Sequence, residues 1–320
     1  MTNTPPKISL YKFKFVLQAI ENMKLPAYKG SMFRGAFGWA FKRAVCVTRQ
    51  PTCNNCLLQE HCGYFKVFET EMPENNIPFF NGVKKVPHPF LIEPPLDEKR
   101  EFNEGDILEV GLTLFGYAVK FFPFYVFTFQ QMGKTGVGYR RDKFKLLSVI
   151  NYDSHGAEEV IYTEDNGKLK TNYHEIKETD ILADANNNIS KITLDFITPF
   201  RIQHEGRIIK DSSKLNTQIL LSALQRRVIS ISRLFCDDDS VQLNEFDDIK
   251  IEIAQNTLVY KLLERYSNRQ KRKMDIGGFV GKITLTGNIK EIIPLLYLSR
   301  ELNIGKNTAF GLGKFNVLLS

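Results

Sequence analysis

The sequence lacks the features of a membrane-spanning or exported protein. No apolar run is long enough to cross a bilayer. The first residues, MTNTPPKISLYKFKF, alternate like a strand after a short tail and do not resemble a signal peptide. We therefore expect a cytoplasmic protein, in which structural disulfides are rare. Of the 320 residues, 43% are hydrophobic and 25% are charged, which is typical of a globular protein.

Acidic residues are outnumbered, with 36 Asp and Glu against 43 Lys and Arg, and the formal net charge is +7. The imbalance is local. Residues 21–50 hold six bases and one acid, and residues 261–282 hold seven bases and two acids. Residues 237–248 hold six acids and no base, as expected of a solvated loop. Clustered bases beside glycine-bearing segments predict a nucleic acid as the anionic partner.

Four of the five cysteines fall within residues 46–62, and two of them form a CxxC pair. Soft, closely spaced thiols in a chain without an export signal favour a structural tetrahedral zinc site. His61 could replace one thiolate. An iron–sulfur or redox role, or thiols without any metal, are the alternatives that this spacing leaves open. The expected zinc ligands are Cys46, Cys53, Cys56 and Cys62.

Glycines and lysines crowd the C-terminal end, where residues 303–317 read NIGKNTAFGLGKFNV. Glycines allow a tight turn, and exposed amides beside lysines make a good cradle for phosphate. The alternative is a simple turn before an edge strand. A similar segment, MGKTGVGYRRDKF, occupies residues 132–144, which indicates a two-fold internal repeat. The expected ligands of RNA phosphate here are Gly305, Lys306, Gly311, Gly313 and Lys314.

Hydrophobic periodicity predicts an α+β fold of two ferredoxin-like (RRM-like) β-α-β-β-α-β domains in tandem. In the first half we expect strands at 8–20 and 106–115, a helix at 31–47 and a short helix near 119–132. In the second half we expect strands at 191–202, 250–260 and 278–287, helices at 216–235 and 289–302, and a final strand. The predicted domains are residues 1–185, with a cysteine-rich insertion at 46–62, and residues 186–320, with a glycine-rich loop at 303–315.

Several segments resemble one family in the same order along the chain. They are LPAYKGSMFRGAFGWAF (25–41), the cysteine loop ending in CGYFKVFE (62–69), YSNRQKRKMDIGGFVGKITLTG (266–287) and the terminal IGKNTAFGLGKFNV (304–317). Together they resemble the CRISPR-associated repeat-processing endoribonucleases of the RAMP superfamily, in a branch with a cysteine-rich loop.

The resemblance implies a protein that binds CRISPR repeat RNA and cuts the precursor transcript once per repeat. It implies catalysis without a metal, with 2′,3′-cyclic phosphate and 5′-hydroxyl products. A different class of protein also fits, namely a non-catalytic RAMP subunit that holds RNA within a CRISPR effector complex. A zinc-stabilised RNA-binding protein unrelated to CRISPR is the third alternative.

Such cleavage needs groups that move protons and stabilise the charge on phosphorus. Many family members use a histidine near the first helix, but residues 31–47 contain none. The leading candidate is therefore His204, in a polar loop, with Tyr28 and Lys29 ahead of the first helix as further candidates. His88, between two prolines, is interpreted as part of a rigid loop. The remaining residues expected to bind RNA are Arg34, Arg269, Lys271 and Arg272.

Overall fold

The computed structural model describes residues 5–70, 86–183, 185, 189–240, 246, 250–267 and 271–319. The chain forms two compact units. One comprises residues 9–176, and the other comprises residues 177–320 together with the first eight residues. The predicted boundary at 185/186 lies nine residues beyond this division at 176/177. Residue Lys7 joins the second unit through its amide, which donates to Asp238 Oδ2 at 2.9 Å.

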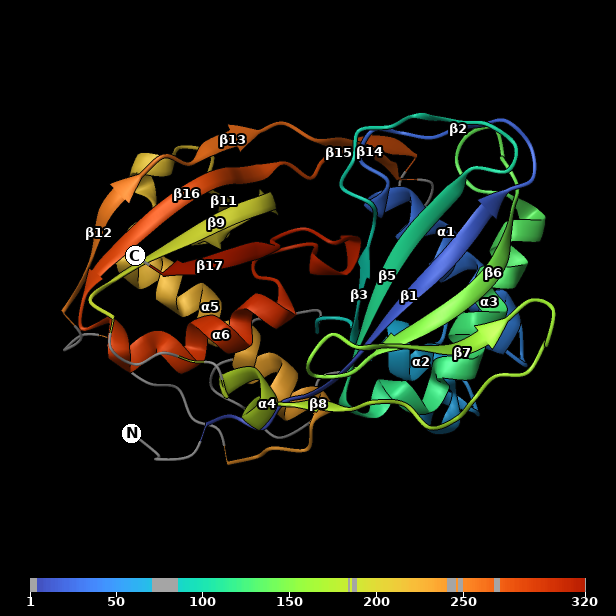
Figure 1. The fold of residues 1–320 in the computed structure, drawn as a ribbon, viewed down its shortest axis with the longest axis horizontal. Coiled ribbons are helices and arrows are strands. Elements are labelled where there is room, and N and C mark those ends of the chain that lie inside the picture. The colour runs from blue at the N-terminus through green and yellow to red at the C-terminus, as the bar shows by residue number, and fades with distance from the viewer. Residues whose placement is uncertain are drawn as a thin grey trace. The chain divides into compact units, whose positions relative to one another are not determined.

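The unit of residues 9–176 is built on an antiparallel sheet with the order β3-β5-β1-β6-β7. Its strands are β1 (Ser9–Ala19), β3 (Phe90–Glu93), β5 (Ile107–Phe115), β6 (Phe144–Tyr152) and β7 (Glu158–Thr163), and β8 (Ile176–Lys177) also pairs with β1. Helices α1 (Gly30–Val45) and α3 (Phe122–Thr135) lie on one face of the sheet (Figure 1). The short helices η1 (Gln59–His61), α2 (Gly63–Phe68) and η3 (Gly116–Phe121) and the small sheet of β2 (Met23–Lys24) and β4 (Glu101–Phe102) complete this unit.

Aromatic rings fill the core between this sheet and its helices. Phe15 of β1 stacks on Phe129 of α3 with ring centroids 4.1 Å apart, and Phe37 of α1 stacks on Tyr125 at 5.1 Å. The alternation of apolar residues along β1 places these side chains on one face of the sheet, which is why the period-two pattern predicted the strand correctly. Burial of such large rings dominates the stabilisation of this unit.

The second unit repeats the plan with the order β12-β16-β9-β17. These strands are β9 (Lys191–Phe200), β12 (Ile251–Asn256), β16 (Gly278–Gly287) and β17 (Phe315–Leu319). Its helices are α4 (Glu178–Leu182), α5 (Thr217–Phe235), capped by the Asn216 side chain, and α6 (Ile293–Leu302), which has a proline in its first turn. The remaining elements are β10 (Gln203–His204), β11 (Arg207–Ile208), η4 (Ser212–Lys214), β13 (Val259–Lys261), β14 (Glu264–Ser267), β15 (Arg272–Asp275), η5 (Ile289–Ile292) and η6 (Thr308–Phe310).

The four ferredoxin strands are β1, β3, β5 and β6 in one unit and β9, β12, β16 and β17 in the other. Numbered 1 to 4 along the chain, they have the order 2-3-1-4 across the sheet in both units. The predicted tandem ferredoxin-like fold is therefore confirmed. The glycine segments also correspond. Gly136 and Gly138 have φ values of 80° and 75°, and Gly311 and Gly313 have 81° and 74°. Each segment precedes the last ferredoxin strand of its unit, β6 or β17, so the repeat inferred from the sequence is a structural repeat.

Within the described ranges, none of the helices combines the length and the apolarity that a bilayer crossing requires.

Candidate functional site

Lys29, expected to be catalytic, is completely buried at the start of α1. Its ammonium lies 3.0 Å from Asp97 Oδ1 and donates to the Asp97 carbonyl at 3.0 Å. Burying a charge is costly unless it is paired and hydrogen-bonded, and Lys29 satisfies that condition with Asp97. The side chain therefore anchors the segment of Asp97 to the helix, and its catalytic role stays a prediction.

Tyr28 is also turned into the protein. Burial raises the pKa of its phenol well above the ordinary value, and the negative charge of Glu93 raises it further. The protonated phenol is thereby favoured at neutral pH. The catalytic role expected of Tyr28 stays a prediction.

Arg34 and His88 form a pair that the sequence did not predict. Arg34 lies on α1, and His88 lies in the loop that leads into β3. Arg34 Nη2 contacts His88 Nε2, and the guanidinium lies over the Phe68 ring at 5.1 Å. The imidazole in turn stacks on Phe90 at 5.4 Å. A histidine thus reaches the first helix from another part of the chain.

The chemistry of this pair fixes the protonation of the imidazole. A guanidinium only donates hydrogen bonds, so His88 Nε2 accepts and the ring proton sits on Nδ1. The acceptor nitrogen of the imidazole therefore lies beside a cation. The two prolines around His88 suggested only a rigid loop. The absence of histidine from α1 was the one signal that another histidine must approach it.

His204 lies on the two-strand hairpin formed by β10 and β11. Its side chain is 52% exposed, and Nε2 lies 3.9 Å from the carboxylate of the adjacent Glu205. His204 belongs to the unit of residues 177–320, whereas Tyr28 and Lys29 belong to the unit of residues 9–176. Its catalytic role stays a prediction.

The C-terminal glycine loop uses its amides internally. The Lys306 amide donates to the Arg201 carbonyl at 2.7 Å, the Gly313 amide to the Pro199 carbonyl at 3.1 Å, and the Lys314 amide to Thr198 Oγ1 at 2.8 Å. The Gly311 amide closes a turn on the Thr308 carbonyl. These four amides are not available to phosphate, so the expectation of an amide cradle is wrong for them. Gly311 and Gly313 are buried and shape the loop.

The loop instead presents the exposed Lys306 side chain. Partial burial lowers the pKa of this ammonium, and the positive charge of Arg226 on α5 lowers it further. Two cations that repel each other at short range gain stability when an anion lies between them. Lys306, with the charge of Arg226 acting on it, therefore stays a predicted phosphate-binding residue of this loop. Lys314 is half-buried at the end of the loop.

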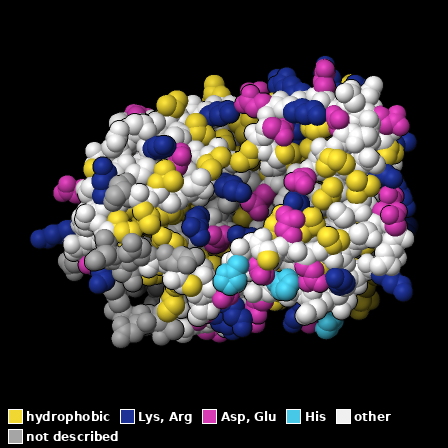
Figure 2. Space-filling model, in the orientation of Figure 1, with side chains coloured by type: hydrophobic (Ala, Val, Ile, Leu, Met, Phe, Trp, Pro, Cys, Tyr) yellow, Lys and Arg dark blue, Asp and Glu magenta, His cyan; other side chains and the backbone are white. Residues whose placement is uncertain are grey.

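The hairpin of β14 and β15 adds basic side chains beside the same loop. Its Arg265 guanidinium lies 4.9 Å from the centre of the Phe310 ring, which belongs to the loop. Lys271, with φ of 53°, and Arg272 are exposed on this hairpin. The predicted RNA-binding residue Arg269 lies outside the described residues. On the face that Figure 2 shows, basic and acidic side chains are interspersed and do not form one continuous basic patch.

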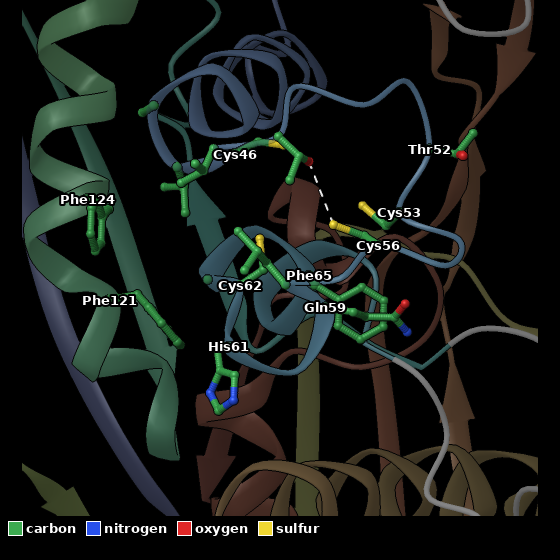
Figure 3. Close-up of a pocket in the computed structure, with 16 residues that line it drawn as sticks. Cys46, Thr52, Cys53, Cys56, Gln59, His61, Cys62, Phe65, Phe121 and Phe124 are labelled. Carbon is green, nitrogen blue, oxygen red and sulfur yellow. Dashed lines mark hydrogen bonds between the residues drawn. The ribbon is translucent and has the colours of Figure 1, made fainter.

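The four clustered cysteines line one cavity of about 360 Å³ with mostly apolar walls. Thr48 Oγ1 lies 3.8 Å from Cys46 Sγ and 3.7 Å from Cys56 Sγ, while the His61 ring points away from Cys53 and Cys56 (Figure 3). Burial raises the pKa of the Cys53 thiol.

The expected zinc site is not supported by this geometry. In the part of the chain that the structure describes, which includes all four clustered cysteines, no three His, Cys, Asp or Glu side chains are arranged to hold a metal ion.

Comparison with known proteins agrees with this architecture. The family model AF_1859_N, an N-terminal domain, matches residues 8–174, and the model described as CRISPR-associated endoribonuclease Cas6 matches residues 194–315. An uncharacterized protein of Archaeoglobus fulgidus is 23% identical over 302 residues, covering 92% of each chain.

Solved structures share the fold. Cas6 of Thermus thermophilus superposes with a TM-score of 0.52 at 14% identity, covering 97% of this chain and 99% of its own. A Cas6 product complex superposes with a TM-score of 0.54 at 14% sequence identity, and the match covers 97% of this chain and 100% of that chain. A chain of a partial Cas6-RT-Cas1–Cas2 complex superposes with a TM-score of 0.55 at 13% sequence identity. It covers 98% of this chain, which spans only 46% of that longer chain.

The match over residues 8–174 covers more than half of the chain, so the chain belongs to the AF_1859_N family. Its second unit matches the model of the CRISPR-associated endoribonuclease Cas6, the family that the sequence motifs resemble.

Proposed function

We propose that this protein is an endoribonuclease that binds CRISPR repeat RNA and cleaves the precursor transcript within each repeat. The observation that carries the proposal is the match of the Cas6 endoribonuclease model to residues 194–315, a range that contains the glycine loop and its Lys306. The fold shared with a Cas6 product complex supports it. The paired cations Lys306 and Arg226 supply a place for RNA phosphate.

The proposed reaction is a metal-independent transesterification. The 2′-oxygen attacks the adjacent phosphorus as the bond from phosphorus to the 5′-oxygen breaks. The products are a 2′,3′-cyclic phosphate and a 5′-hydroxyl. The Arg34 guanidinium exchanges its contact with His88 Nε2 for a non-bridging phosphate oxygen where negative charge develops, and the freed Nε2 lone pair takes the 2′-hydroxyl proton. The 5′-oxygen takes its proton from water, and the catalytic role that the sequence favours for His204 stays a separate prediction.

One further function has a specific observation in its favour. Helix α1 carries no histidine of its own, as expected of a RAMP subunit that holds RNA without cutting it. The partners would then be guide RNA and other CRISPR effector subunits. A fold shared with part of the chain in a Cas6-RT-Cas1–Cas2 complex is consistent with such assembly.

We expect cleavage of the host's own repeat RNA to persist in excess EDTA, because protein side chains supply all of the proposed proton transfers and charge stabilisation. A single 2′-deoxy substitution at the cut position should abolish that cut, because it removes the nucleophile. Denaturing gel electrophoresis with end-labelled RNA measures both effects. Tight binding without any cut would contradict the endoribonuclease and favour the RNA-holding subunit.

Lys306→Ala should weaken binding of repeat RNA and reduce the slope of log K against log salt by about one, because one phosphate contact is lost. Filter binding at several salt concentrations measures the slope. Lys290→Ala is the matched control, since Lys290 is an exposed lysine of the same unit on η5, away from the glycine loop. An unchanged slope in the Lys306 variant would remove Lys306 from the RNA interface.

A further inference from the structure

The chain contains one tryptophan, and it is not in the core. Trp39 lies on α1 with half of its side-chain surface exposed (50%). The core side of the same helix is formed by Phe33, Phe37 and Phe41, which are completely buried. The Arg43 guanidinium, one helical turn further on, lies 4.5 Å from the centre of the Trp39 ring. A large aromatic surface and a positive charge therefore face solvent together.

A second aromatic ring is exposed on the glycine segment between α3 and β6. Tyr139 has full solvent exposure, with a relative accessible surface of 103%. Its neighbours Arg140 and Arg141 are also exposed. Of these, Arg140 pairs with Asp142 at 3.4 Å, whereas no ion pair joins Arg141 or Arg43 to an acid among the residues with described positions.

The backbone that presents Tyr139 is fixed. The amides of Val137 and Asp142 donate to each other's carbonyls at 2.9 and 3.0 Å, and the buried Asp142 carboxylate accepts from the Lys24 amide at 2.7 Å. Gly136 has φ of 80°, and a Cβ there would meet the Arg141 carbonyl oxygen at 1.9 Å. The turn is thus tightly closed, and a side chain held out from a fixed turn is organised for contact with another molecule.

The two aromatic residues belong to one surface. A Cβ on Gly138 would lie 3.5 Å from Met32 Sδ, which places the turn beside the N-terminal part of α1. Met32 and Trp39 are seven residues apart, which is about two helical turns, so they share a face of the helix. We name this face of unit 9–176, formed by Trp39, Arg43, Tyr139, Arg140 and Arg141, the aromatic–arginine surface.

We propose that the aromatic–arginine surface binds a single-stranded segment of RNA, with bases stacked on Trp39 and Tyr139 and phosphates held by the arginines. The inference rests on the proposed function, which supplies the RNA. Exposed aromatics interleaved with arginines are what unpaired bases and their backbone require, since every base has a face that can stack. A paired duplex hides its base faces and would not fit.

This surface is separate from the Arg34 and His88 pair. Arg34 precedes Trp39 by five residues, so the two side chains leave α1 about 140° apart. Trp39 therefore binds RNA away from the reacting phosphate, and changing it should affect affinity and KM but not kcat.

The single tryptophan makes the test direct. We expect short oligouridylate, and the host's repeat RNA, to quench Trp39 fluorescence to saturation, with a blunt RNA duplex of equal length much less effective. Trp39→Ala and Tyr139→Ala should each weaken binding about tenfold, measured by anisotropy of labelled oligouridylate. Trp39→Phe should retain most of the affinity. Phe127→Ala is the control, since Phe127 is 45% exposed on α3 outside this surface, and it should change nothing.

The outcomes separate this inference from the proposed function. Anisotropy could show that RNA binds while Trp39 fluorescence stays unchanged and the Trp39 and Tyr139 variants bind as tightly as the native protein. That result would overturn the proposal for the aromatic–arginine surface and leave the proposed endoribonuclease activity intact. A protein partner at this face would give that same result. Quenching and weakened variants without any cleavage would support the surface and overturn the endoribonuclease. Absence of RNA binding would overturn both.

Discussion

His88→Ala should slow cleavage of repeat RNA at saturating substrate by about 10² to 10⁴-fold while leaving RNA affinity within a few-fold of the native value. The size follows from the loss of one general base in proton transfer. The pair with Arg34 gives the reason for choosing this histidine, because Nε2 is held as a neutral acceptor beside a cation on α1. Single-turnover kinetics with end-labelled RNA measure the rate separately from binding.

Two variants sharpen that experiment. His155→Ala removes an exposed histidine of the same unit and should leave the rate unchanged. His204→Ala tests the residue that the sequence favoured, and a large loss there would make it the catalytic acid or base. Normal cleavage by the His88 variant would contradict the mechanism proposed for the Arg34 and His88 pair. The pH–rate profile adds a second readout, because loss of a base removes the limb that rises with pH.

Gly313→Ala should lower the free energy of unfolding by about 3 kcal/mol, from left-handed strain combined with a backbone clash. Gly313 has φ of 74°, and a Cβ there would lie 1.8 Å from the carbonyl oxygen of Ile304. That contact cannot relax through a flexible side chain. The Ile304 amide also donates to the Gly313 carbonyl at 3.0 Å, so a shift breaks this pairing. Urea unfolding measures the change.

Gly206→Ala is the matched control for the clash. Gly206 has φ of 78°, close to that of Gly313, but on the exposed hairpin of β10 and β11 a Cβ at this position would have no neighbour within 4 Å. Gly206→Ala should lower the free energy of unfolding by only about 1 kcal/mol, because it adds the strain of the left-handed backbone conformation without a clash. An equal loss of unfolding free energy in the two variants would show that the clash with the Ile304 carbonyl adds nothing to the backbone strain. A destabilised glycine loop should also weaken RNA binding, because it displaces Lys306.

Local patterns predicted most of the fold because they report on each segment's own geometry. Period-two alternation located β1, β5, β9 and β16, and helical spacing located α1 and α5. Positive φ at Gly136, Gly138, Gly311 and Gly313 is a local requirement that glycine satisfies at low cost. The duplicated glycine segments therefore revealed the two-fold repeat from the order of residues alone.

Local patterns failed where long-range packing decides what a side chain does. The motif around Lys29 suggested catalysis, but Asp97, far along the chain, encloses its charge in the fold. The C-terminal glycines and lysines suggested an amide cradle, but three of the amides there donate to β9 and to Arg201, which follows it. Clustered thiols favoured zinc, and the cavity that these described cysteines line does not bring three ligands together.

The sequence by itself determined the tandem ferredoxin-like fold, because strand and helix periodicity and glycine turns are local properties of the chain. The tertiary structure alone decided that His88 meets Arg34, which is 54 residues away, and that the turn carrying Tyr139 lies beside Met32 of the helix that carries Trp39. Both contacts depend on which strands pair in the sheet and on which helix packs against those strands. No spacing in the sequence encodes them, because loop closure and core packing bring distant residues together.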